Sequence, residues 1–169
     1  MLPFSEQRQE LVRSVAFVAR CSLAAAASYK LACWLGLSMP VWASMSALIV
    51  SQDRWQDTEL SLQERIRGTS LGVSISLAVN LIAMSIGTST TIQLIVAVAI
   101  CAAIARVDRS VRVCMWTCPI VLIPGQAGAN PVIVVGLYRA LEIVVGCLVA
   151  GALALVTERL LTQLKIIRQ

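Results

Sequence analysis

The chain has 169 residues, of which 58% are hydrophobic and only 14% are charged, and this balance excludes an ordinary soluble globular domain. The net charge is +5, but the basic residues flank apolar runs and form no solvated stripe with interleaved aromatic side chains, so no nucleic-acid partner is expected. We expect a single all-α membrane domain over residues 1–169, with membrane lipid as its surroundings.

Hydropathy divides the chain into six apolar segments, which predict a polytopic protein with six transmembrane helices. In chain order the segments are 11–36, 39–51, 65–85, 90–105, 113–124 and 132–160. Three connections hold no charge, and they alternate with the charged ends and connections of the chain. Buried segments of a soluble core would not produce this alternation. By the positive-inside rule it places both termini and the charged connections in the cytoplasm.

The segment 57–64, which precedes the third predicted span, has the sequence of a helix start. Asp57 or Thr58 can act as the N-cap, and Ser61 with Glu64 has the spacing of a capping box. We expect a helix that starts on the membrane surface and runs without a break into the third span.

The sequence matches itself at an offset of 74 residues. The shift aligns residue types that are less frequent in this chain than Ala and Leu: Trp42 with Trp116, Arg65 with Arg139, and Gly72 with Gly146. Chance matching in a biased composition is the alternative explanation. A real duplication gives one repeat over about 11–85 and another over about 90–160. Each has three spans, so the second repeat is inverted in the membrane, as in many secondary transporters.

The middle span of each repeat is short. Span 39–51 and span 113–124 each cover about 20 Å of a hydrocarbon core about 30 Å thick, and prolines lie in or beside both. Short or interrupted segments at matching positions of two repeats point to a binding site between them. A locally thinned bilayer, or spans extended by loop residues, is the alternative.

The third and sixth predicted spans have small residues at four-residue intervals, which let helices approach closely in lipid. They are Gly68, Gly72, Ser76 and Asn80 in the third span and Gly146, Ala150 and Ala154 in the sixth. We expect these two spans to pack tightly together and Asn80 to form an interhelical hydrogen bond.

Three charged residues, Arg20, Arg139 and Glu142, lie deep inside apolar runs. A charge at the bilayer centre costs about 2.5–3.5 kcal/mol, so these residues should face the protein interior and pair. In the structural interpretation, Glu142 forms a salt bridge with Arg20 or Arg139 that only joins helices. In the functional interpretation, the two arginines attract substrate carboxylates and Glu142, the one acidic residue deep in a predicted span, carries a proton.

Two further pairs of residues are candidates for the substrate pathway. Arg65 and Arg67, near the cytoplasmic boundary, are suited to a basic vestibule that concentrates anions, or simply to headgroup anchoring. Trp42 and Trp116 are suited to stacking on an aromatic substrate, or to interface anchoring and core packing.

The stretch PVWASMSALIVSQ, followed by LQERIRGTSLG, resembles the membrane domain of the fusaric acid resistance (FUSC) and aromatic acid exporter family. That domain is also similar to plant aluminium-activated malate transporters. The resemblance rests on Trp42, Arg65, Gly68, Thr69 and Gly72, with a looser copy at Trp116, Arg139 and Gly146. It implies a six-helix domain that moves organic anions outward across the bacterial inner membrane as an oligomer.

The sequence has no phosphate-binding glycine loop, no hydrolase nucleophile elbow and no metal-binding cluster, so we expect no enzyme activity, no cofactor and no metal. The first hypothesis is an inner-membrane exporter of organic, in particular aromatic, carboxylate anions, with or without proton coupling. The alternatives are a passive organic-anion channel and a non-transporting membrane subunit or assembly partner. A homodimer or other homo-oligomer is expected, because six helices with two short spans leave little room for a sealed pathway.

Overall fold

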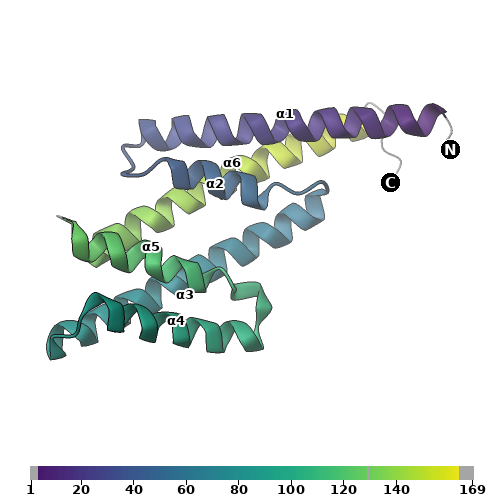
Figure 1. Cartoon of the computed structure of the whole chain (residues 1–169). Coiled ribbons are helices and arrows are strands. Elements are labelled where there is room, and N and C mark those ends of the chain that lie inside the picture. Colours follow the sequence, from purple (N-terminus) through teal and green to yellow (C-terminus); the bar gives the residue numbers. More distant parts are fainter. Residues whose placement is uncertain (1–3, 129, 164–169) are drawn as a thin grey trace. The chain divides into compact units, whose positions relative to one another are not determined.

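The computed structural model describes residues 4–128 and 130–163, and every regular element among them is a helix. The elements are α1 (Phe4–Trp34), α2 (Val41–Val50), α3 (Trp55–Ile86), α4 (Thr90–Val107), the 3₁₀ turn η1 (Arg109–Val111), α5 (Cys114–Ala127) and α6 (Val132–Gln163) (Figure 1). The predicted all-α class is confirmed, and one α-helix coincides with each of the six predicted spans.

Four of these helices contain a segment that is long and apolar enough to cross a membrane, namely α1, α3, α4 and α6. At 1.5 Å per residue, α2 is about 15 Å long and α5 about 21 Å. The prediction that the second and fifth helices are short is therefore confirmed. α5 does not end at Pro124 as expected, because the helix continues through this proline to Ala127.

α3 begins before the membrane-spanning segment and is continuous, as predicted for residues 57–64 and the span that follows. The expected N-cap is wrong, because the helix already begins at Trp55 and both Asp57 and Thr58 lie in its first turn. The Thr58 hydroxyl instead accepts a hydrogen bond from the Gln52 N–H at 3.1 Å. This contact ties the first turn of α3 to the end of α2.

The described residues form two compact units. The first unit contains the residues up to Gly36, Pro40–Leu62 and the residues from Val145 onward. The second contains Leu37–Met39 and Gln63–Val144. Because α3 and α6 contribute to both units, the units do not coincide with the expected repeats.

In the first unit, α1 lies along α2 (Figure 1). The Ser44 hydroxyl on α2 donates to the Ala25 carbonyl oxygen on α1 at 3.1 Å. Gly146 of α6 lies against α2, since a Cβ at this position would collide with the Ala43 carbonyl and lie 2.9 Å from the Ser46 Cβ. Small side chains thus set the spacing between the helices of this unit.

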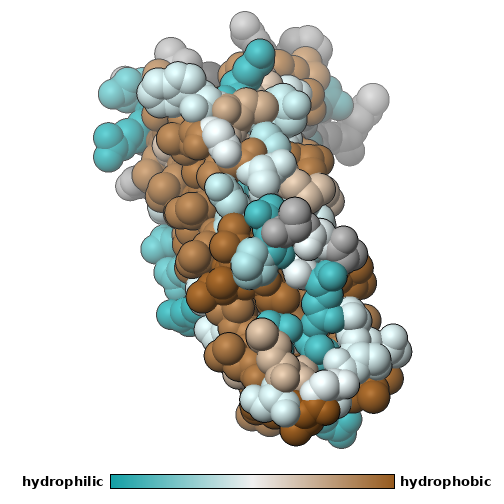
Figure 2. Space-filling model, turned by 90° about the vertical axis from the view of Figure 1, so that its left-hand side faces the viewer, coloured by the Kyte–Doolittle hydropathy of each residue, from teal (hydrophilic) through white to brown (hydrophobic). Residues whose placement is uncertain are grey.

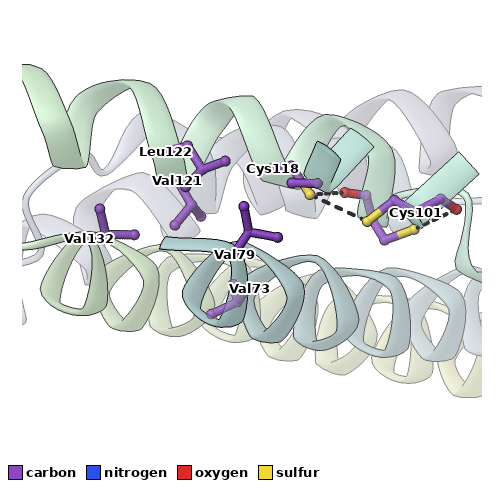
Figure 3. Packing of buried hydrophobic residues seen from close by; sticks show 9 residues of the cluster. Val73, Val79, Cys101, Cys118, Val121, Leu122 and Val132 are labelled. Atoms are coloured by element: carbon purple, nitrogen blue, oxygen red, sulfur yellow. Dashed lines mark hydrogen bonds between the residues drawn. The ribbon is translucent and has the colours of Figure 1, made fainter. Parts of the chain in front are cut away.

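In the second unit, the core is built from α3, α4, α5 and the first residue of α6. Figure 3 shows Val79, Val121 and Val132 gathered between the helices, with Cys101 and Cys118 further along the same core. The two glycines of α3 admit the start of α5, because a Cβ on Gly72 would lie 2.6 Å from the Thr117 Cβ. A Cβ on Gly68 would lie 2.7 Å from the Val113 Cβ.

The glycines therefore lie at close helix contacts. The third and sixth predicted spans do approach each other, since a Cβ on Gly136 of α6 would lie 3.1 Å from the Val73 Cγ1 of α3. Gly72 and Gly146, however, meet other helices: Gly72 lies against α5 and Gly146 against α2. The two contacts are related by the sequence offset, since Gly72 plus 74 is Gly146 and Ala43 plus 74 is Thr117. In each contact, the last helix of one expected repeat packs on the middle helix of the other.

The surface of the protein is largely apolar. Figure 2 shows hydrophobic side chains over much of the face in view. Large hydrophobic residues are exposed on all four long helices; examples are Val18, Leu81, Ile95 and Leu148, each about 60% exposed or slightly more. Together with the four spanning helices, this surface indicates a multi-pass membrane protein.

We predict that Gly72→Ala destabilises the protein, because the new methyl group would meet the Thr117 Cβ and the Cys114 backbone rather than a flexible side chain. Overpacking of this kind costs about 1–3 kcal/mol. The apparent melting temperature in detergent should fall clearly. Gly151→Ala is the matched control, since its Cβ would meet only the tip of Leu62 at 3.2 Å. Equal melting temperatures for the two variants would contradict the tight contact at Gly72.

Candidate functional site

Arg139 and Glu142 form a buried ion pair on α6. They lie one helical turn apart, and Arg139 Nη1 is 2.9 Å from Glu142 Oε2. Their side chains are 3% and 0% exposed. Of the two pairings that the sequence left open for Glu142, this is the one that the structure shows. The two residues of such a buried pair depend on each other energetically, because removal of either one leaves the charge of the other buried and uncompensated.

The second oxygen of Glu142 binds the connection that precedes α2. Glu142 Oε1 accepts a hydrogen bond from the Met39 backbone N–H at 2.6 Å and a longer one from the Ser38 hydroxyl at 3.4 Å. Arg139 Nη2 lies 3.6 Å from the Met39 sulfur. Residues 38 and 39 precede the first turn of α2, so this N–H has no partner within a helix. Glu142 therefore holds both a cation and a stretch of non-helical backbone.

Arg20 lies elsewhere, in the first unit. Its side chain is buried, its guanidinium donates to the Gln52 carbonyl oxygen, and it lies 5.3 Å from the centre of the Phe17 ring. It borders a cavity of about 30 Å³ together with charged residues of both signs: Arg13, Asp53, Arg54 and Glu158. Arg20 thus holds the connection between α2 and α3.

Arg65 and Trp116, both predicted pathway residues, lie together in the second unit. The Arg65 guanidinium carbon is 6.0 Å from the centre of the Trp116 ring, within cation–π range. Arg65 is buried, whereas about half of Trp116 is exposed. The pair places a buried positive charge beside a half-exposed indole ring.

Arg67 and Trp42, the other two predicted pathway residues, are not part of these pairs. Arg67 is exposed on α3, and its charge acts on Asp108, which follows α4. Trp42 lies half-buried in the first unit, near the start of α2.

A cluster of amide side chains joins three helices of the second unit, and of its members the sequence analysis singled out Asn80 alone. Gln93 Oε1 accepts from Asn80 Nδ2 at 3.2 Å and from Gln126 Nε2, while Gln93 Nε2 donates to the Thr88 carbonyl at 3.1 Å. Gln126 Oε1 accepts from the Thr90 hydroxyl. The interhelical hydrogen bond expected of Asn80 is confirmed. Glutamines within apolar helices were the sequence signal for the rest of the cluster.

Three cysteines fill the core of the same unit. Cys101 Sγ lies 3.3 Å from Cys118 Sγ, and Cys114 and Cys118 are also fully buried (Figure 3). Cys118 Sγ is 3.8 Å from the Gly72 carbonyl oxygen, so the thiols also contact α3. Within the part of the chain that the structure describes, no group of three His, Cys, Asp or Glu side chains is arranged to hold a metal ion.

A family model described as fusaric acid resistance protein-like matches residues 23–153 of the chain. The match includes the C-terminal part of α1, all of α2 to α5 and most of α6. No curated protein and no solved structure matches the chain.

We predict that the Arg139–Glu142 pair is energetically coupled. Arg139→Leu leaves the Glu142 carboxylate buried without its ion-pair partner, and such a loss costs about 3–5 kcal/mol. The double variant R139L/E142Q should be less destabilised than R139L alone, because the glutamine is neutral and its amide oxygen can still accept from Met39. Denaturant titration of the purified protein in micelles measures both. Arg159→Leu, an exposed change on the same helix, is the control, and purely additive losses would contradict the coupling.

Proposed function

Because the chain belongs to the fusaric acid resistance protein-like family, we propose that it exports organic carboxylate anions, in particular aromatic ones, across a bacterial inner membrane. The family suggests a membrane transport or efflux role. The observation that carries the finer proposal is the Arg139–Glu142 pair, which is buried within the apolar run 132–156 of α6. Ionisable groups at such positions are costly, and they typically mark the pathway of an ion or substrate.

The proposed topology has six spans in two inverted repeats, with both termini in the cytoplasm. The alternating charge of the connections supports the orientation. The contacts of Gly72 with Thr117 and of Gly146 with Ala43 support the repeat, because both contacts follow the same 74-residue offset. In inverted-repeat transporters, short or broken helices at matching positions of the repeats are typical of the substrate pathway, and α2 and α5 are short helices at matching positions of this chain.

In the proposed mechanism Glu142 alternates between two states. Ionised Glu142 holds Arg139 with one oxygen and residues 38–39 with the other. Protonation removes the negative charge, so Arg139 becomes available to a substrate carboxylate, which a guanidinium can bind through two parallel hydrogen bonds. Deprotonation lets Glu142 reclaim Arg139 and releases the substrate. The proton and the anion are thereby bound together and move in the same direction, so an outward concentration gradient of the anion drives export in this cycle.

Preference for aromatic substrates is assigned to Arg65 and Trp116. A guanidinium group matches a carboxylate, and the half-exposed indole ring of Trp116 is suited to stacking on the substrate ring. Arg67 is exposed on α3, the helix that also holds Arg65, and its positive charge raises the local concentration of anions. In the first unit, Arg20 and Trp42 stay candidates for the pathway. A homodimer, or another homo-oligomer, is the proposed assembly.

The proposal predicts uptake of radiolabelled 4-hydroxybenzoate or benzoate into proteoliposomes, above that of protein-free vesicles. Trp116→Leu and Arg65→Gln should each reduce this flux about tenfold, because each removes one of the two groups that recognise an aromatic carboxylate. Trp34→Leu is the matched control, since Trp34 is 84% exposed and far more accessible than Trp116. Its flux should equal that of the wild type.

The outcomes separate the alternatives. Flux that is equal in Trp116→Leu and Trp34→Leu would remove Trp116 from the pathway. No flux over a panel of aromatic and aliphatic carboxylates, with folded wild-type protein, would contradict transport and leave the non-transporting membrane subunit as the better account.

A further inference from the structure

The second unit has an open hollow at the connection between α4 and α5. Three arginines border it, Arg106, Arg109 and Arg112, and the remaining lining residues are Ala102, Ala105 and Met115. Its volume is about 640 Å³, within the range of small-molecule sites. The hollow therefore combines three guanidinium groups with an apolar floor.

The charge of this hollow is not offset by its own lining. No carboxylate among the described residues lies within salt-bridge distance of the three arginines. Asp108, the acidic residue of this connection, accepts a hydrogen bond from the Ser110 N–H at 2.9 Å, and hydrogen bonding to Ser110 holds the pKa of its carboxyl below the ordinary value. It caps the 3₁₀ turn and does not line the hollow.

The arginine-lined cavity of the first unit differs on this point. Arg13, Arg20 and Arg54 are accompanied there by Asp53 and Glu158, and the cavity volume is only about 30 Å³. That cavity is large enough for about one water molecule. Of these two sites, the hollow at the connection between α4 and α5 is the larger one, and its lining contains no acidic residue.

An exposed apolar strip of α4 leads to the hollow. Ile95, Ala99, Ala102 and Arg106 follow one another at intervals of four, three and four residues, so they share one face of the helix. Ile95 is 63% exposed, and Ala99 is exposed as well. A ligand with a negative head and a long apolar tail fits this sequence of surfaces better than a free anion does.

We propose that the hollow binds the headgroup of an anionic phospholipid, with its phosphate among Arg106, Arg109 and Arg112 and an acyl chain along the Ile95–Ala99–Ala102 strip. Guanidinium groups form strong, charge-assisted hydrogen bonds with phosphate oxygens. Basic pockets of membrane proteins at the cytoplasmic surface bind lipid headgroups in this way. The site is independent of the proposed transport pathway.

The test is native mass spectrometry of the purified protein titrated with phosphatidylglycerol or phosphatidylcholine. Each basic residue strengthens binding to anionic lipid by about fivefold, so the triple variant R106Q/R109Q/R112Q should bind phosphatidylglycerol about a hundredfold more weakly than the wild type. The control R13Q/R54Q/R159Q removes the same charge from exposed positions outside the hollow and should keep wild-type binding. The single variant R109Q, in the 3₁₀ turn, replaces the triple variant if that one fails to fold.

Three results would overturn the proposal. Equal affinity of the wild type for the two lipids would show that the hollow does not select an anionic headgroup. Equal losses in the two triple variants would show a general effect of charge. Displacement of phosphatidylglycerol by benzoate or by water-soluble glycerophosphoglycerol at similar concentration would show a site for free anions, in which the acyl chain has no part.

Discussion

Two opposite charges one turn apart on α6 cannot stay unpaired in an apolar environment, and this constraint shapes the segment that meets them. Glu142 uses one oxygen for Arg139 and the other for Met39 and Ser38. Residues 37–39 belong to the second unit, although the helices on either side of them belong to the first. The carboxylate thus satisfies a backbone donor that has no partner in a helix, and it makes α6 and this connection interdependent.

Within each unit, close packing depends on small residues rather than on large hydrophobic ones. In membranes, the apolar side chains gain little from contact with each other over contact with lipid, so tight approach and internal hydrogen bonds favour one helix arrangement over others. Gly72 against Thr117 and the hydrogen bonds of Gln93 serve this role in the second unit. Gly146 against α2 serves it in the first.

The sequence predicted the helices well, because long apolar runs and charged connections leave few alternatives in a membrane. Local sequence patterns also predicted three further features: the short α2 and α5, the unbroken α3, and the Arg139 pairing as one of two for Glu142. Each of them depends on residues that are close together in sequence. The partners of Gly72 and Gly146 could not be predicted, because a row of small residues shows that another helix comes close but not which helix it is. The bond from Met39 to Glu142 joins residues 103 apart, and no local pattern indicates it. Gln93 and Gln126 did carry a signal, because each is a polar residue in an apolar helix. Their partners could not be predicted from it, since the two glutamines are 33 positions apart in sequence.

The measurement that tests the central claim most directly is 4-hydroxybenzoate flux into proteoliposomes under an imposed pH gradient, for the wild type, Glu142→Gln and Glu158→Gln. Protein-free vesicles correct for passage of the neutral acid through lipid. Glu158 is the control, because it lies on the same helix but in the first unit, beside the small cavity. The account predicts that the gradient accelerates flux in the wild type and in Glu158→Gln but not in Glu142→Gln. Flux that ignores the gradient in the wild type, or acceleration that persists in Glu142→Gln, would contradict it.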